Sequence, residues 1–334
     1  MNDRRRFLGG MAAAAASIAL PNAVAQPSAR VLTATDVHVK DYPTVATVGW
    51  IGEQLERETA GRVRLRQYHS GQLGREAESI DMARFGAIDI TRVYSGALNN
   101  AFPLTQALCL PYVFESVPHL RRVLDGAVGQ AVLDGFSARG LVGLAIFDSG
   151  ARCFYNTSRP IYAPSDLRGL KFRVPGSDIF IRLLRMFGAN PTPLAYGEVF
   201  SGLETHLIDG AENNMRSFHS SRQFEAAPYW SQSEHSYAPD VLLMSKRSFD
   251  ALDPRDRGLL VDISRRSVKV MRDLWDSSEQ TAREAVLAAG VKINEVDIDS
   301  FRKASQPLLS DYAAMPAMAP LLRRVQALAG ASDG

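Results

Sequence analysis

Cysteine is scarce in this sequence, with only Cys109 and Cys153 among 334 residues. Two cysteines exclude a disulfide framework, and the sequence has neither a CxxC pair nor zinc-ligand spacing. Both cysteines stand in apolar surroundings, LCLP and ARCFY, which predicts buried free thiols. A single bridge between them stays open, because an oxidising compartment permits one.

Motifs of catalysis and cofactor binding are also missing. The sequence has no GxSxG, HExxH, Walker-type GK[ST], GxGxxG or EF-hand loop. Its histidines are scattered, and none stands at metal-ligand spacing. We therefore expect no cofactor and no metal, although an active site assembled from distant residues would leave no such motif.

No apolar run is long enough to span a bilayer, which takes roughly 20 residues. The run Met11–Leu20 follows a basic start with the pattern Arg-Arg-x-Phe-Leu at Arg4–Leu8, and Ala23–Ala25 forms a small-residue cleavage signature. This arrangement predicts a twin-arginine-type signal peptide over residues 1–25. We expect cleavage after Ala25 and a soluble periplasmic protein, with a membrane anchor as the alternative that the short run disfavours.

An excess of either charge is absent once this segment is removed. The whole chain has 38 lysines and arginines and 36 aspartates and glutamates. Residues 1–25 hold three arginines and one aspartate, which leaves 35 basic and 35 acidic residues. A neutral chain argues against a general nucleic-acid or anionic-membrane surface. The remaining length, about 300 residues, predicts two lobes rather than one core.

Helix and strand patterns alternate through the first half of the chain. Val31–Val39 predicts a strand, and Asp41-Tyr-Pro opens a helix that Gly61 ends. Further strands are expected at Val63–Tyr68 and Ile88–Tyr94, with a helix between them, so the pattern predicts an α/β lobe with a largely parallel sheet. The first helix has the apolar stripe Val45, Val48, Ile51 and Leu55, and that of the second includes Ile80, Ala83 and Ala87.

Three polar loops follow the predicted strands of this lobe. They are Asp36–His38, His69–Glu76 and Tyr94–Ser95. Ligands of parallel sheets gather at the loops beyond the carboxyl ends of the strands. These loops are therefore candidates for ligand contacts.

The second half begins after Leu141–Phe147, an almost wholly apolar segment that is typical of a strand buried on both faces. In this half Ser177 is a candidate cap of a helix that stops at Gly188. Tyr196–Leu207 predicts another helix, and Leu207–Asn214 predicts a short strand and loop.

A very long helix is expected to start at Asp253 and Pro254 and to run to Ala289, before Gly290. At about 1.5 Å per residue it would extend roughly 54 Å, more than the width of one lobe. We therefore expect it to run along both lobes, with two helices separated by a break as the alternative. Small helices that pack back onto the body are expected after Asp297.

The segment Ser149–Pro175 carries Arg152 and Arg173 in apolar or turn-rich surroundings. Phe172 and Val174 would point to one face of a strand and Arg173 to the other. A guanidinium at the end of a strand presents a rigid fork of donors that matches a carboxylate. The central hypothesis is that Arg173, helped by Arg152, holds the carboxylate of a small organic acid. The alternative is a solvated surface residue, as is common for an arginine on the polar face of a strand.

Several segments, in this order and spacing, resemble the periplasmic solute-binding subunits of TRAP transporters, the DctP-like family. The resemblance runs from about Ala29 through nearly the whole remaining chain. The segments are HSGQLGRE (His69–Glu76), LPYVFES (Leu110–Ser116), DSGAR (Asp148–Arg152), DLRGLKFRVP (Asp166–Pro175), YGEVFSGLETHLIDGAENN (Tyr196–Asn214) and the long helix after Asp253.

This resemblance implies a two-lobed α/β periplasmic binding protein fold, with a long helix spanning both lobes and a ligand cleft between them. Crossings similar to those of the family would lie near Gly150, near Tyr237 and within the long helix near Ser277. Lobe I would then hold residues 26–149 and 237–277, and lobe II residues 150–236 and 278–334. The implied partners are a small organic acid and TRAP membrane permease subunits. We expect a monomer that catalyses no reaction and binds no nucleic acid.

The resemblance also implies which residues bind the ligand. The carboxylate-clamping arginine falls on Arg173, a second ligand-contacting arginine on Arg152, and an asparagine that binds the same carboxylate on Asn213, beside the further candidate Asn214. The aromatic residue under the ligand falls on Tyr196 and an acidic loop residue on Glu76. Contacts from the first lobe are expected around Asp36, His38, His69 and Tyr94.

The residues suit a sugar acid. Glu76 and Asp36 accept hydrogen bonds when ionised, which suits sugar hydroxyls and disfavours a second ligand carboxylate. Tyr196 could supply an apolar face. In the segments YPTV, RVYSGALNN and GAENN, the chain looks most like the family members that bind hexuronates such as D-glucuronate or D-galacturonate. Met215-Arg216 departs from the proline-containing turn that is commoner in the family, and a cation from Arg216 near the pocket rim would favour a different or more acidic solute.

Three alternatives stay open from the sequence. A C4-dicarboxylate or 2-oxo acid is the alternative ligand. A periplasmic sugar-acid enzyme would use Glu76 and His69 as acid and base. A ligand-sensing partner of a membrane receptor is the third possibility.

Overall fold

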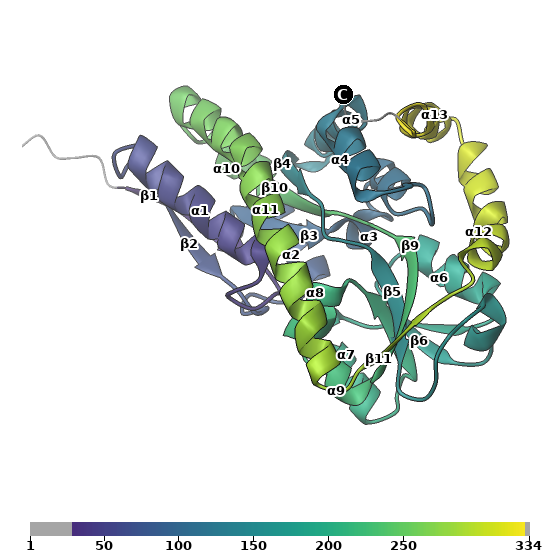
Figure 1. The fold of residues 1–334 in the computed structure, drawn as a ribbon. Coiled ribbons are helices and arrows are strands. Elements are labelled where there is room, and N and C mark those ends of the chain that lie inside the picture. Colours follow the sequence, from purple (N-terminus) through teal and green to yellow (C-terminus); the bar gives the residue numbers. More distant parts are fainter. Residues whose placement is uncertain (1–28, 331–334) are drawn as a thin grey trace, which may run out of the picture.

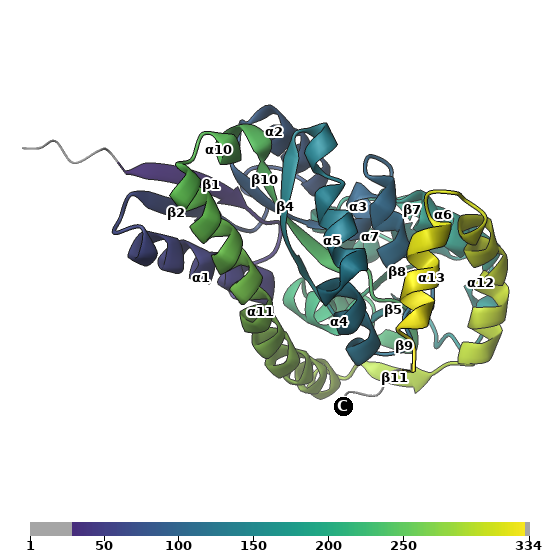
Figure 2. The ribbon, with the colours of Figure 1, turned by 90° about the horizontal axis from the view of Figure 1, so that it is seen from above.

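The structure is a computed structural model that describes residues 29–330. The signal peptide expected over residues 1–25 lies outside the described residues. The chain forms two α/β halves, each built around one β-sheet, with a long helix running along both (Figures 1 and 2). Among residues 29–330, no helix combines the length and the apolar character that crossing a membrane requires.

The first sheet has five strands in the order β2–β1–β3–β10–β4. Strand β1 pairs in parallel with β2 and β3, as expected, whereas β10 runs antiparallel to β3 and β4. This reversal pairs Asp240, the first residue of β10, with Tyr94, the last residue of β3. The strands are β1 (Arg30–Thr35), β2 (Val63–Tyr68), β3 (Ile90–Tyr94), β4 (Leu141–Phe147) and β10 (Asp240–Ser245), and the helices of this half are α1 (Pro43–Glu58), α2 (Glu76–Phe85), α3 (Ser95–Leu98), η1 (Pro103–Leu108), α4 (Val117–Asp125), α5 (Ala127–Asp134), η2 (Ser137–Arg139) and α10 (Lys246–Asp250).

The second sheet has six strands in the order β11–β9–β5–β8–β6–β7. Strand β5 is antiparallel to both β8 and β9, while β6 is parallel to β7 and β8. The strands are β5 (Arg152–Asn156), β6 (Lys171–Val174), β7 (Asn190–Pro193), β8 (Gly210–Asn213), β9 (Tyr229–Ser236) and β11 (Lys292–Glu295), and the helices are η3 (Pro164–Leu167), α6 (Asp178–Met186), η4 (Tyr196–Glu198), α7 (Val199–Glu204), α8 (Met215–Ser220), α9 (Gln223–Ala226), α12 (Ile298–Ala313) and α13 (Ala319–Ala327). The C-terminal helices pack back onto the body, α12 against α6 and α13 against α5.

The long helix is one unbroken element, α11 (Pro254–Ala288), of 35 residues. Asp253 caps it, because its side chain accepts a hydrogen bond from the backbone N–H of Arg255 (2.9 Å). The helix packs against α1, β4 and α8 (Figure 1). Trp275 joins the core around the first sheet and Val286 the core around the second. Each such buried side chain stabilises the fold by roughly 1.5–3 kcal/mol, so α11 ties both halves together.

Local patterns predicted much of the first half correctly. All four stripe residues of α1 are buried, with at most 3% of their surface exposed. Strand β1 is shorter than expected, because the Asp36 side chain accepts a hydrogen bond from the backbone N–H of His38 (2.9 Å) and turns the chain. The place of Ala87 in the stripe of α2 is wrong: Gly86 ends this helix in the left-handed conformation, and Ala87 is exposed.

Two further expectations have a clear outcome. The helix expected over Tyr196–Leu207 is the short η4 followed by α7, and His206 beyond it adopts a positive φ of 56°. Cys109 and Cys153 are both buried and free, as their surroundings predict.

The crossing between the halves after β4 contains Gly150, which has a φ of 69°. A Cβ atom there would lie 2.8 Å from Glu279 Oε1 and 3.0 Å from Trp275 Cζ2, both side chains of α11. Only glycine adopts this backbone conformation without cost, and this close approach leaves no room for a side chain.

Gly150→Ala is therefore expected to lower the melting temperature by more than the roughly 2–8 °C that a left-handed alanine, at about 1–2 kcal/mol, would cause alone, because the added Cβ also meets α11. Thermal unfolding followed by circular dichroism measures this change. Gly169→Ala is the matched control, because Gly169 has a φ of 78° and no neighbour within 4 Å. A loss in the control as large as that in Gly150→Ala would contradict a role for the contact with α11.

Candidate functional site

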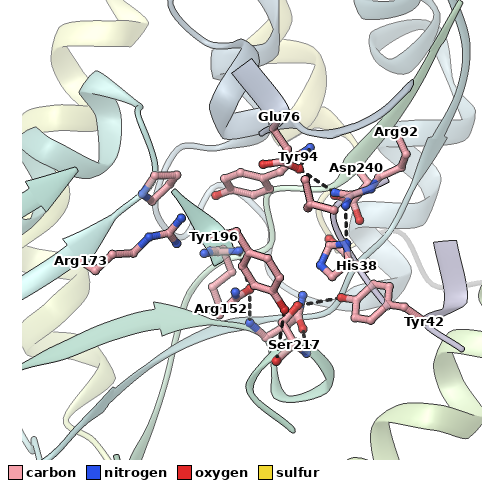
Figure 3. Close-up of a pocket in the computed structure, with 15 residues that line it drawn as sticks. His38, Tyr42, Glu76, Arg92, Tyr94, Arg152, Arg173, Tyr196, Ser217 and Asp240 are labelled. Atoms are coloured by element: carbon pink, nitrogen blue, oxygen red, sulfur yellow. Dashed lines mark hydrogen bonds and ion pairs between the residues drawn. The ribbon is translucent and has the colours of Figure 1, made fainter. Parts of the chain in front are cut away.

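A cavity lies between the two sheets, where the ends of β1 and β3 face the ends of β6 and β8 (Figure 3). It holds about 400 Å³ of space not filled by protein atoms, part of it open to solvent. Residues from both halves line it: Val37, His38, Tyr42, Glu76, Arg92, Tyr94, Ser149, Arg152, Arg173, Pro175, Tyr196, Asn213, Asn214, Ser217 and Asp240.

Arg173 lies on one side of this cavity, at the end of β6 (Figure 3). Its Nε donates a hydrogen bond to the Leu194 carbonyl (2.9 Å), and it is 5% exposed. Within residues 29–330, no carboxylate lies within 4.0 Å of its guanidinium, and both Nη groups are left to donate into the cavity. Burial lowers the pKa of Arg173 from its ordinary value. A guanidinium stays charged at neutral pH, so this buried cation lacks a counter-ion that a ligand carboxylate can supply.

Arg152, the first residue of β5, has a different surrounding. Its Nε and Nη2 bind the Glu212 carboxylate (2.5 and 2.9 Å), Nη2 also binds the Glu212 carbonyl (2.9 Å), and Nη1 binds Asn213 Oδ1 (2.9 Å). Four of the five guanidinium N–H donors are thereby used. Arg152 can thus offer one donor to a ligand, whereas Arg173 can offer four.

The asparagine pair at the end of β8 is held in defined orientations. Asn213 Oδ1 accepts hydrogen bonds from Arg152 and from the backbone N–H of Asn214 (2.9 Å). Its amide nitrogen is therefore left as a donor for a ligand. Asn214 caps α8, because its Oδ1 accepts a hydrogen bond from the backbone N–H of Ser217 (2.7 Å). Asn213 therefore adds a donor next to the two arginines.

Aromatic side chains form the next part of the wall. His38 stacks on Tyr42 with ring centres 3.8 Å apart, and Tyr196 lies against His38 at 4.9 Å. The Tyr42 hydroxyl is hydrogen-bonded to Ser217 Oγ (2.8 Å), a contact between the two halves. The ring of Tyr94 lies under the Arg152 guanidinium at 4.6 Å. These rings give the cavity apolar faces for a carbon skeleton.

The opposite side is built around Arg92, whose side chain is fully buried (Figure 3). Its Nε binds Asp36 Oδ2 (3.0 Å), and its Nη1 binds Glu76 Oε1 (2.9 Å) and Asp240 Oδ1 (3.1 Å). Nη2 binds Asp36 Oδ1 and contacts His38 Nδ1. Three carboxylates thus share one guanidinium. This side, which we call the acceptor wall (Asp36, Glu76, Arg92 and Asp240), has a formal charge of minus two.

Residues 36–315 match the DctP family, described as bacterial extracellular solute-binding protein, family 7. The chain belongs to this family. The TRAP periplasmic solute-binding protein of Bradyrhizobium sp. btai1, in complex with α/β-D-galacturonate, is 44% identical, with a TM-score of 0.88 over 89% of this chain and 100% of that one. That of Xanthobacter autotrophicus Py2, with β-D-galacturonate, is 42% identical (TM-score 0.87, 89% and 99% covered). That of Roseobacter denitrificans, with β-D-glucuronate, is 35% identical (TM-score 0.86, 89% and 99% covered).

The DctP-family protein is therefore the periplasmic solute-binding subunit of a TRAP transporter. It binds a small organic acid, works with membrane permease components, and belongs to a transport family rather than an enzyme family. The family, the two-lobed fold and the periplasmic location expected from the sequence are confirmed.

The structure brings eight of the ten expected site residues of this DctP-family protein to the cavity wall and leaves two away from it. Asp36, although part of the acceptor wall, does not line the cavity, and its oxygens are occupied by Arg92, the His38 backbone and the Thr44 hydroxyl (2.7 Å). His69 lies outside the cavity and contacts Ser70 Oγ through its ring (2.9 Å). The ones on the wall are His38, Glu76, Tyr94, Arg152, Arg173, Tyr196, Asn213 and Asn214.

Arg216, expected near the rim, does not line the cavity. Its Nη2 donates to the Asp41 carbonyl (3.3 Å), and its guanidinium lies 5.7 Å from the centre of the Tyr42 ring. Its charge is thus engaged with the first half of the DctP-family protein rather than directed at a ligand.

Sequence reasoning missed Arg92 and Asp240. A signal for Arg92 existed, since it is the one charged residue in the buried strand ITRVY. Asp240 gave none, because the rule for parallel strands points to their carboxyl ends, and Asp240 starts a strand that runs the other way. Tyr42, Ser149 and Ser217 also line the cavity without having been expected there.

The ion pair behind Arg152 makes a prediction about acid stability. Burial opposes ionisation of Glu212, but Arg152 and His235 outweigh it and lower the pKa of this carboxyl to about 2. The stabilisation is fully present above the ordinary pKa of 4.5 and is lost as the pH falls toward 2. In Glu212→Gln the free energy of unfolding should be lower at pH 7 by a few kcal/mol, because each pKa unit corresponds to about 1.4 kcal/mol.

Urea unfolding of Glu212→Gln at several pH values tests this point. Its stability should vary less than that of the wild type between about pH 4.5 and 2. Glu225→Gln, at an exposed carboxylate paired with Arg222, should keep the wild-type pH dependence. If the free energy of unfolding falls with pH equally in Glu212→Gln and the wild type, Glu212 is not the source of the acid sensitivity.

Proposed function

We propose that this subunit captures a hexuronate, D-galacturonate or its C4 epimer D-glucuronate, and delivers it to the TRAP permease. The observation that carries the proposal is the arrangement of charge across the cavity. The unpaired Arg173 guanidinium lies on one side and the acceptor wall on the other (Figure 3). A sugar ring with one carboxylate and several hydroxyls matches both sides.

In this proposal each wall residue has a part. Arg173 holds the carboxylate as a fork, with one further donor each from Arg152 and Asn213. Tyr196 packs on the ring of the sugar. The free oxygen of Glu76 accepts a hydroxyl, since Oε1 is taken by Arg92 and by the backbone N–H of Tyr94 (3.1 Å). Asp36 positions Arg92 and His38 instead of touching the ligand.

We further propose that the two lobes close around the ligand. Lobe I would hold residues 26–149 and 237–277, and lobe II residues 150–236 and 278–334. The crossing at Gly150, the link between β9 and β10 and helix α11 would bend. We also propose that the subunit is a monomer with one ligand site per chain.

A thermal-shift screen of hexuronates against dicarboxylates and 2-oxo acids tests the proposed ligand. D-Galacturonate and D-glucuronate should raise the melting temperature most, since a ligand at 100 times its Kd adds about 2.7 kcal/mol. Calorimetry should give one site per chain, and chromatography should recover the ligand unchanged. A larger shift with succinate or malate would reject the hexuronate, and a new product would reject a purely binding role.

A further inference from the structure

We propose that Asp240, held by Arg92, is a specificity-determining residue that accepts a sugar hydroxyl and rejects ligands with a second carboxylate. This inference rests on the hexuronate function proposed above and names the residues that exclude the corresponding diacids.

The geometry around Arg92 Nη1 is the first ground. This one nitrogen binds Glu76 Oε1 (2.9 Å) and Asp240 Oδ1 (3.1 Å). Each carboxylate is therefore fixed through one oxygen. The second oxygens, Glu76 Oε2 and Asp240 Oδ2, have no partner within residues 29–330 and belong to residues that line the cavity. The wall thus presents two acceptors side by side.

The strand arrangement is the second ground. Asp240 pairs with Tyr94 in the antiparallel β10–β3 ladder, so the start of β10 lies beside the end of β3. Glu76 contacts the same place, because it accepts a hydrogen bond from the Tyr94 backbone N–H (3.1 Å). Asp240 is 3% exposed, and its place is set by two flanking strands, because it also pairs with Phe147 of β4. The carboxylate is thus a rigid part of the wall rather than a mobile surface group.

The charge count is the third ground. Arg92 is the cation of the wall and is shared by three carboxylates, so a second ligand carboxylate there would meet a net negative surface. A hydroxyl or hemiacetal group at the same place can donate to Glu76 Oε2 or Asp240 Oδ2. Arg92 acts here as a positioning residue, since four of its five N–H donors bind the carboxylates of the acceptor wall.

The experiment compares D-galacturonate with galactarate, which has the same carbon chain but a carboxylate at both ends. Calorimetry gives the ratio of the two dissociation constants for the wild type and for Asp240→Asn. The wild type should prefer galacturonate by at least about a hundredfold, and Asp240→Asn should reduce this preference by at least about tenfold. Asp41→Asn, the same charge change at an exposed position next to Tyr42, should leave the preference unchanged.

Glu76→Gln provides a second variant, because its side chain is 17% exposed and less tightly enclosed than Asp240. It should shift the preference in the same direction. If the wild type binds galacturonate and both variants keep its preference within twofold, the inference is wrong while the proposed function stands. If the wild type binds neither acid, both are wrong. Equal affinity of the wild type for the two acids would also overturn the inference.

Discussion

Replacing Arg173 with glutamine is expected to weaken hexuronate binding by roughly 10²–10⁴-fold. Removing one partner of a buried charge pair costs roughly 3–5 kcal/mol, and about 1.4 kcal/mol corresponds to a factor of ten in affinity. Arg173 offers both Nη groups to the cavity, whereas Arg152 has one donor left. Calorimetric titration with D-galacturonate measures the loss.

Lys171→Gln is the matched control for this variant. Lys171 lies two residues away on β6, has a side chain that is 46% exposed, and does not line the cavity. It should keep wild-type affinity. Arg173→Lys keeps the charge but loses the planar fork and should fall between the two.

The stability of the ligand-free variant provides an independent test. In the absence of ligand the Arg173 cation is buried without a carboxylate partner, so Arg173→Gln should be at least as stable as the wild type. A variant that binds with near-normal affinity would refute the clamp. One that unfolds more easily without ligand would show that Arg173 is structural.

Replacing Arg92 with methionine is expected to have the largest effect on folding. It leaves Asp36, Glu76 and Asp240 close together without their shared cation, which should cost roughly 3–5 kcal/mol at pH 7. Burial already raises the pKa of Asp240. The loss of Arg92 should raise it further, so the neutral form becomes the stable one in the folded variant.

The sign of the pH dependence follows from this raised pKa. A stabilisation that requires the protonated carboxyl is present at low pH and is lost as the pH rises through the folded pKa. Urea unfolding should therefore show a partial recovery of Arg92→Met between pH 7 and pH 5. Arg64→Met, at an exposed ion pair with Glu56, should lose no more than about 1 kcal/mol. A variant as stable as this control, or one that loses stability on acidification, would contradict the account of the wall.

Elements with strong local signals were predictable from the sequence. The stripe of α1 and the length of α11 follow from side-chain periodicity and capping, and both are present. The end of α2 and the early end of α7 are followed by left-handed backbone at Gly86 and His206, which periodicity does not report.

The site residues that lie at or after the carboxyl ends of parallel strands were predictable from the sequence. Arg173 is at the end of a strand whose alternation is visible in the sequence, but its burial depends on the opposite half of the molecule. Asp240 is far from every other wall residue in sequence and comes close through an antiparallel strand. Asp36 looked like a ligand contact because it follows β1, yet its oxygens are occupied by neighbours that only the folded chain brings together.

A crystal structure of the protein with D-galacturonate tests the central claim most directly. The ligand carboxylate should lie about 2.7–2.9 Å from both Nη atoms of Arg173, with Asn213 as a further donor. The hydroxyls at the other end of the sugar should contact Glu76 and Asp240. A carboxylate bound beside Arg92, or a sugar bound outside the cavity, would contradict the account.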